Sequence, residues 1–233
     1  MTRRQPGEFH DWQFDDPRLQ DFSPELWTDD YSEVARNLLS SATRCFAAKG
    51  FQGTTTRDIS AGAGLSPAAL YVHFPTKEHM LFEITRVAHD KAHKALLIPD
   101  PGDPVEHLRS VVAEHVTCNA RHHVAARVAQ YEMANLTADH LAEVRVIRRR
   151  TTTLYRNLVS HGIDRGAFIP VDVTRVVRGI IALAIDPVRW YRLSGPDTPE
   201  ELGTFNAGLA VALVTGGNQP DQGPGRRNSV STS

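Results

Sequence analysis

Long hydrophobic runs are absent from this 233-residue sequence, and cysteines are few. No stretch of about 18 apolar residues occurs, so no membrane-spanning helix is predicted. Residues 1–16 lack the apolar segment of a secretory signal. Cys45 and Cys118 each lie inside a helical apolar pattern, which favours buried thiols in a reducing compartment over a disulfide. We therefore expect a cytoplasmic globular protein with no membrane partner.

The sequence also lacks the common signatures of catalysis. It has no glycine-rich phosphate loop, no nucleophile elbow and no paired-carboxylate pattern. No alternating strand-type run of any length occurs, which argues against a sheet-containing fold. We expect a protein that is not an enzyme and needs no cofactor.

Charge is unevenly distributed along the chain. The net charge is −1, but residues 1–30 hold eight acids and three bases, and the rest holds 19 acids and 23 bases. A net charge near zero argues against a general coat for nucleic acids. We interpret residues 1–28 as an acidic, loosely ordered extension beside a mildly basic body.

Apolar residues recur at helical spacing along almost the whole remaining chain. The predicted fold is all-α, with about nine helices. They are expected at roughly residues 30–50, 56–63, 67–74, 76–98, 104–121, 122–136, 137–162, 172–187 and 198–216. Residues 217–233 are rich in Pro, Gly and Ser, and we expect them to be disordered.

Two short helices lie close together in TTRDISAGAGLSPAALYVHFPTKE, residues 55–78. Gly64 ends the first of them, and Ser66 and Pro67 provide the N-cap and first residue of the second. The separation of about three residues is typical of a DNA-binding helix-turn-helix. By spacing alone, an ordinary αα-hairpin fits equally well.

Residues 34–82 resemble the DNA-binding domain of the TetR family of repressors. The matching motifs are Phe46 to Gly50, Thr54 to Ser60, Ala63 to Ser66, Leu70 to Phe74 and Lys77 to Leu81. The sequence departs from the family pattern at Ser60, Leu65 and the Pro67-Ala68 pair. The last departure affects base and phosphate contacts, so the operator sequence cannot be taken from relatives.

The resemblance implies a three-helix DNA-binding domain at residues 29–75 and an effector-binding and dimerisation domain at 76–216. It implies a ligand-responsive regulator, most simply a repressor, that binds a palindromic operator in double-stranded DNA. Arg57 and residues 67–69 are then expected to read bases, and Tyr71, His73 and Lys77 to contact phosphates. The full DNA-facing set is Thr55, Thr56, Arg57, Ser66, Pro67, Ala68, Ala69, Tyr71, His73 and Lys77.

The effector is indicated only in outline. Residues 190–202, WYRLSGPDTPEEL, are similar to a segment of family members that control lipid and steroid breakdown, although Leu193 replaces a proline. This similarity favours an apolar or acyl-thioester (acyl-CoA-like) effector, but Trp190 and Tyr191 could equally just pack the last helices. The candidate effector contacts are polar or amphipathic groups on the sensor helices: His115, Asn119, Tyr131, Asn135, Tyr155 and Trp190.

Two apolar helix stripes near the C-terminus predict a two-fold homodimer. They would pair with their copies as a four-helix bundle. The candidate interface residues are Val177, Ile181, Leu202, Phe205 and Leu209.

Two constellations admit a second interpretation. His89 and His93 have the spacing of a zinc-binding helix, so the alternative function is a helical metal-dependent enzyme. Asp90 stands where a metalloprotease has Glu and no third ligand is evident, so no metal site is expected. The cluster of Arg145 and residues 148–150 fits a solvated helix face or, alternatively, recognition of phosphates on a CoA-type effector. The sequence leaves open the effector's identity, the operator, the regulated genes and the choice between repression and activation.

Overall fold

The computed structural model describes residues 19–216. The expectations for residues 1–18 and for the tail at 217–233 lie outside the described residues. Between residues 19 and 216 the secondary structure is helical, with no β-strand. The predicted all-α fold is confirmed. None of the described helices combines the length and hydrophobicity needed to cross a membrane.

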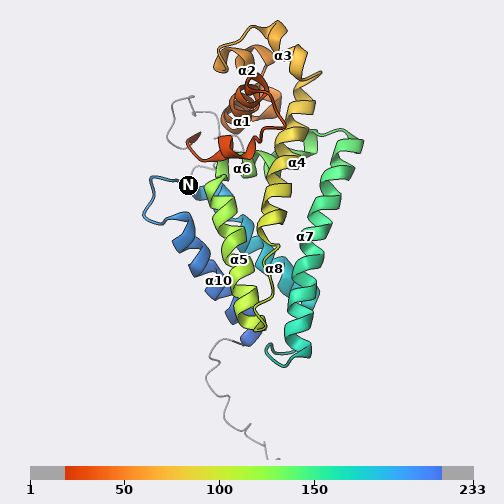
Figure 1. The fold of residues 1–233 in the computed structure, drawn as a ribbon, viewed down its shortest axis with the longest axis vertical. Helices are drawn as coiled ribbons and strands as arrows, with labels where there is room; N and C mark the ends of the chain where they lie inside the picture. The colour runs from red at the N-terminus through yellow and green to blue at the C-terminus, as the bar shows by residue number, and fades with distance from the viewer. Residues whose placement is uncertain (1–18, 217–233) are drawn as a thin grey trace, which may run out of the picture.

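A small three-helix head sits at one end of the molecule (Figure 1). It consists of α1 (Glu33–Gly53), α2 (Thr56–Gly62) and α3 (Pro67–His73). α1 kinks at Gly50, whose φ of 71° lies in the left-handed region that glycine adopts without steric cost. The kink turns the chain towards α2.

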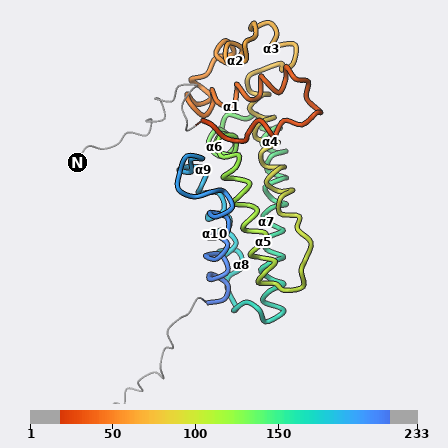
Figure 2. The backbone as a smooth tube through the Cα atoms, turned by 60° about the vertical axis from the view of Figure 1, so that its left-hand side comes forward, coloured from red at the N-terminus to blue at the C-terminus, as the bar shows by residue number. Residues whose placement is uncertain are grey.

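An elongated helical body carries the head (Figures 1 and 2). α4 (Lys77–Ala95) runs from the head into the body, and α7 (Ala138–Asp164) is the longest helix. The other body helices are α5 (Pro104–Arg121), α6 (His123–Tyr131), α8 (Val173–Ile185), α9 (Pro187–Trp190) and α10 (Pro199–Thr215). Side-chain oxygens accept hydrogen bonds from first-turn amides at Thr76, Asp103, Thr137, Asp172 and Thr198. These N-caps explain why the helices begin where they do.

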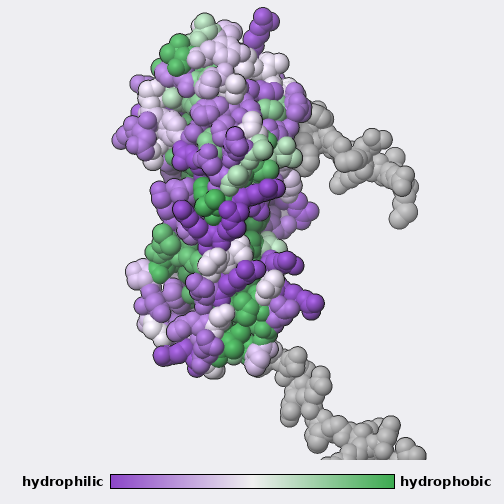
Figure 3. All heavy atoms as spheres, turned by 90° about the vertical axis from the view of Figure 1, so that its right-hand side faces the viewer, coloured by the Kyte–Doolittle hydropathy of each residue, from purple (hydrophilic) through white to green (hydrophobic). Residues whose placement is uncertain are grey.

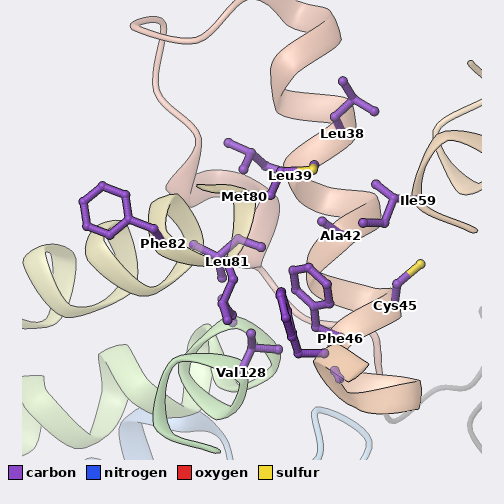
Figure 4. Close-up of a cluster of buried hydrophobic side chains, with 14 of the residues drawn as sticks. Leu38, Leu39, Ala42, Cys45, Phe46, Ile59, Met80, Leu81, Phe82 and Val128 are labelled. Atoms are coloured by element: carbon purple, nitrogen blue, oxygen red, sulfur yellow. The ribbon is translucent and has the colours of Figure 1, made fainter. Parts of the chain in front are cut away.

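Two buried hydrophobic clusters hold the fold together. The first joins α1, α2 and α3 to α4 and also includes α6, so that Phe46, Leu81 and Val128 converge in one core (Figure 4). The second lies among α5, α7, α8 and α10. Because α6 shares the core of the head, packing is continuous across the predicted boundary at residue 75.

The segment at residues 19–28 corrects the expectation of a loosely ordered extension. It contains a short 3-10 helix, η2 (Ser23–Leu26), and buries Leu19, Leu26 and Trp27 in the first hydrophobic cluster. The indole Nε1 of Trp27 also donates a hydrogen bond of 2.9 Å to Ser40 of α1. Sequence reading missed this order because so short a stretch with acids and prolines shows no helical period.

The same segment, hereafter the N-terminal segment, also contacts the junction of α5 and α6. The Asp21 carboxylate accepts from the Val124 amide at 2.7 Å, and the Ser23 hydroxyl accepts from the Ala125 amide at 3.1 Å. These bonds satisfy free amides at the start of α6. The segment therefore ties the head to the first turn of α6 (Figure 2).

The contact between α5 and α10 requires a glycine. A Cβ atom on Gly203 would lie 2.4 Å from Thr117 Oγ1 and 2.7 Å from the Ala113 carbonyl oxygen. We expect Gly203→Ala to lower the free energy of unfolding by about 1–3 kcal/mol, because the backbone of α5 has to move. Urea unfolding at fixed protein concentration measures the change, with Thr204→Ala on the exposed side as the control. Equal stability of the two variants would contradict this close packing.

Candidate DNA-binding face and effector cavity

The turn between α2 and α3 is fixed by local hydrogen bonds. Thr55 and Asp58 form a reciprocal capping box at the start of α2, and the Asp58 carboxylate also pairs with Lys49 at 3.2 Å. The hydrogen bond that the Thr55 amide donates to the Asp58 carboxylate is the main reason that the pKa of Asp58 is lowered. Gly64 has a φ of 69°, and Ser66 then caps α3. The arrangement is that of a helix-turn-helix.

The residues expected to face DNA lie together on the outer side of α2 and α3. Leu70 and Ile59 point inward and are buried. The Tyr71 hydroxyl lies 3.3 Å from Thr56 Oγ1, which links the two helices on the exposed side. Exposed members of the expected set are Thr55, Arg57, Ser66, Pro67, Ala68 and Tyr71, and half-buried members are Thr56, Ala69, His73 and Lys77.

Val72 belongs to this face and was missed by sequence reading. Its side chain is 80% exposed, which is unusual for a residue of this hydrophobicity. It follows Ala68 by four residues and so shares that residue's side of α3. That spacing was the available signal. An exposed aliphatic group on such a helix suits the methyl group of thymine.

Lys77 was expected mainly to contact phosphates, but its ammonium group is largely engaged within the protein. Its ammonium donates hydrogen bonds of 2.7 Å to the carbonyl oxygens of Phe51 and Thr54, and it lies 4.2 Å from the centroid of the Phe51 ring. Partial burial lowers its pKa. Lys77 therefore closes the C-terminal end of α1, and one of its three donors remains for a phosphate.

A small cavity of about 70 Å³, partly open to solvent, lies in the body between α4, α5, α6, α7 and α8. Small and aliphatic side chains make up much of its wall, with several polar groups between them. The lining residues are Ala88, His89, Ala92, His115, Asn119, Ala126, Ala129, Gln130, Arg148, Thr151, Thr152, Ile181 and Ile185. Its mixed lining is typical of a small-molecule site, and at this volume the cavity has to widen to admit a drug-sized ligand.

Three of the predicted effector contacts come together at this cavity. His115 lines it and is hydrogen-bonded through Nδ1 to the Tyr155 hydroxyl at 3.0 Å. Complete burial lowers the pKa of His115 to about 4, so the ring is neutral at pH 7. Asn119 donates to the Ala184 carbonyl at 2.9 Å, which connects α5 to α8.

The other three predicted contacts lie elsewhere. Tyr131 is 54% exposed at the end of α6. Asn135 hydrogen-bonds to Gln52 of α1 and to Glu132, so it belongs to the contact between head and body. Trp190 is 45% exposed and donates to Asp186. Helical spacing in the sequence does not show which face of a helix lines the cavity. These three residues lie on faces that point away from it.

Sequence reading did not identify Arg148 as part of the cavity wall. Its Nη1 donates to His89 Nε2 and to Gln130 Oε1, both at 3.0 Å. Burial lowers the pKa of Arg148, which still remains charged at pH 7. In the sequence it is one member of an arginine cluster, and only the packing of α7 against α4 and α6 separates it from its neighbours.

The pair His89 and His93 is not arranged as a metal site. His89 Nδ1 contacts the Thr85 carbonyl at 2.8 Å, while its Nε2 accepts from the Arg148 cation. Burial lowers the pKa of His89 to about 4. His93 Nδ1 is hydrogen-bonded to Thr151 at 3.2 Å. Among residues 19–216, no group of three or more His, Cys, Asp or Glu side chains is placed to hold a metal ion.

The predicted dimer residues do not all lie on one exposed face. Val177 and Leu202 are buried in the second hydrophobic cluster of their own chain, which corrects their assignment to an interface. Ile181 lines the cavity. Phe205 and Leu209 are 64% and 41% exposed on the outer side of α10, where Leu213 also lies. Each stripe is thus divided between an inward and an outward face.

Comparison with known proteins gives consistent matches along the chain. Residues 38–84 match the family of bacterial regulatory proteins, tetR family, and residues 101–214 match the tetracyclin repressor-like C-terminal domain. The HTH-type transcriptional repressor KstR2 of Mycobacterium tuberculosis is 30% identical over 184 residues, covering 77% of this chain and 90% of that protein.

Solved structures agree in fold. A bacterial regulatory protein in the tetR family from Rhodococcus RHA1 is 34% identical, with a TM-score of 0.74 over 79% of this chain and 98% of that one. The ketosteroid transcriptional regulator KstR2 of Mycobacterium tuberculosis is 27% identical, with a TM-score of 0.72 over 81% of this chain and 97% of that one. With its helix-turn-helix head and helical effector domain, the chain belongs to the TetR family of ligand-responsive transcriptional regulators, which bind operator DNA as dimers.

Proposed function

We propose that this protein is a repressor released from a palindromic operator when a steroid- or lipid-derived acyl thioester occupies the cavity. The observation that carries the proposal is the position of the Arg148 cation in a wall whose other residues are apolar or neutral and polar. No Asp or Glu is among the described residues that line this cavity. The protein acts by binding rather than by catalysis, in the cytoplasm where its operator lies.

The electrostatics of Arg148 favour a ligand with acceptor oxygens. A half-buried guanidinium loses part of its hydration, and two neutral partners compensate only in part. A thioester carbonyl or a carboxylate supplies the missing acceptor, while Ala88, Ile181 and Ile185 suit an apolar skeleton. The similarity to a repressor described as a ketosteroid regulator supports a steroid-derived skeleton.

α4 provides the connection between cavity and DNA. Its residues Ala88, His89 and Ala92 line the cavity, while Lys77 at its first turn holds the end of α1. The 19 residues of α4 form a rigid connection of roughly 28 Å at about 1.5 Å per residue. A ligand that displaces α4 moves the two recognition helices of a dimer away from half-sites about 34–36 Å, or a multiple of that, apart. Linkage then requires operator DNA to weaken effector binding by the same factor.

Effector recognition is tested with Arg148→Met. We expect the coenzyme A thioester of a steroid carboxylic acid to bind this variant roughly 10–150-fold more weakly, because a charged hydrogen bond contributes about 1.5–3 kcal/mol. Affinity for operator DNA should be unchanged. Fluorescence anisotropy of labelled operator, titrated with the thioester, measures both quantities. Arg145→Met, at an exposed position of the same helix, is the control. Release of operator from both variants at the same thioester concentration would refute the role of Arg148.

Operator recognition is tested with Arg57→Ala and Lys77→Ala. Arg57 is exposed, so Arg57→Ala should lower the discrimination between bases by about 1–3 kcal/mol and leave the stability of the protein unchanged. Lys77→Ala should weaken all DNA sequences alike and also lower the thermal midpoint, because two carbonyl oxygens lose their donor. Anisotropy with matched and mutated operators and thermal unfolding distinguish the two. A Lys77→Ala variant of unchanged stability would contradict the capping role.

A further inference from the structure

A second concave surface lies on the side of the body formed by α7, the end of α4 and the start of α5. It has a volume of about 840 Å³ and is open to solvent. We call it the basic groove, because Arg149, Arg150, His93, His107 and His161 line it with a single carboxylate, Asp100. The face of the molecule that carries α7 is mixed in character, with strongly hydrophilic and hydrophobic residues side by side (Figure 3).

The positive charges that line the groove outnumber its single carboxylate. Asp100 lies 3.5 Å from His107 Nδ1 and also accepts a hydrogen bond from the Gly102 amide, so it is already engaged. The two adjacent arginines, both exposed, therefore give the groove a net positive charge. Planar guanidinium groups bind phosphate oxygens in a bidentate manner, which makes this pair suited to a ligand with several phosphates.

The groove and the effector cavity adjoin each other. His93 lines the groove and Thr151 lines the cavity, and the two are hydrogen-bonded at 3.2 Å. The residues that precede them in the sequence also line the two spaces: Ala92, before His93, lines the cavity, and Arg150, before Thr151, lines the groove. The two spaces are therefore neighbours along the seam of α4 and α7, with this hydrogen-bonded pair between them.

We propose that the basic groove binds the phosphates of a coenzyme A moiety while the acyl group occupies the cavity. The site is then bipartite: Arg148 faces the thioester end, and Arg149 and Arg150 face the phosphates. Leu154 and Leu158 on the groove wall supply apolar surface for the adenine or the pantetheine chain. This inference rests on the proposed function for the acyl part and adds the recognition of the carrier.

The test uses the full-length protein, free coenzyme A and a steroid carboxylic acid as separate probes. Isothermal titration at millimolar concentration should show saturable binding of free coenzyme A to the wild type. The Arg149→Ala/Arg150→Ala variant should bind it roughly tenfold more weakly or not at all, and the salt dependence should fall. Arg145→Ala/Arg156→Ala, which removes two exposed arginines of α7 outside the groove, should bind as the wild type does.

The outcomes separate the two proposals. If free coenzyme A does not bind, or binds the two double variants equally, the groove is not a phosphate site and the inference is overturned. The steroid acid alone should bind the wild type and Arg149→Ala/Arg150→Ala equally, because it reaches only the cavity. Loss of steroid binding in Arg148→Met with no coenzyme A binding anywhere would keep the proposed function and reject only the groove. If coenzyme A binding needs Arg149 and Arg150 but the thioester does not release operator DNA, the groove is kept as a phosphate site and the proposed function is rejected.

Discussion

Replacing Phe205 and Leu209 together with glutamate is expected to convert the dimer to monomers. Both side chains lie on the outer face of α10 with Leu213, and the described residues 19–216 leave this face exposed. Burying one leucine or phenylalanine contributes roughly 1.5–3 kcal/mol, and a two-fold interface buries each residue twice. Four glutamates in the same place introduce like charges that cannot be paired. Sedimentation analysis measures the mass of the particle.

Affinity for operator DNA should fall when dimerisation is lost. A monomer presents one recognition helix and so loses the second half-site, while its α2–α3 face is unchanged. Leu97→Glu is the matched control, because Leu97 is an exposed leucine beyond the end of α4 and belongs to neither α8 nor α10. That variant should remain a dimer with full operator affinity. If the α10 variant still sediments as an undisturbed dimer, the interface lies elsewhere.

Trp27→Ala should destabilise the protein by about 3–5 kcal/mol, the usual cost of removing a large buried aromatic side chain. The indole lies in the core shared by α1, α4 and α6 and hydrogen-bonds to Ser40. Chemical unfolding at fixed protein concentration measures the loss. Phe22→Ala, at a more exposed position five residues earlier, should cost much less.

The same variant tests the connection between head and α6. Loss of Trp27 should loosen the N-terminal segment and with it the Asp21 and Ser23 bonds to the start of α6. Amide exchange at Val124 and Ala125 should then increase well before global unfolding. Unchanged protection of these two amides would show that α6 holds its first turn without the N-terminal segment.

Local chemistry in the sequence was sufficient for the fold class and for the boundaries of the two short helices α2 and α3. The caps at Thr55, Ser66 and Thr198 fix where helices begin, because they depend only on residues within three positions of each other. The short turn at Gly64 follows in the same way. The residues expected to face DNA came from the resemblance to the TetR family, since spacing alone fitted an ordinary αα-hairpin equally well.

What only the tertiary structure decided is how each helix face is used. Helical spacing places Val177 and Leu202 in apolar stripes like that of Phe205, but packing of α10 on α5 and α8 turns the first two inward. The effector site shows the same limit: Tyr131 and Asn135 have suitable side chains but lie outside the cavity, whereas Arg148 is within it. Lys77 and Trp27 acquire their roles from partners 13 to 26 positions away in the chain. Such contacts depend on how helices rotate and cross when they pack, and a single sequence records the periodicity of a helix without recording which neighbour each face meets.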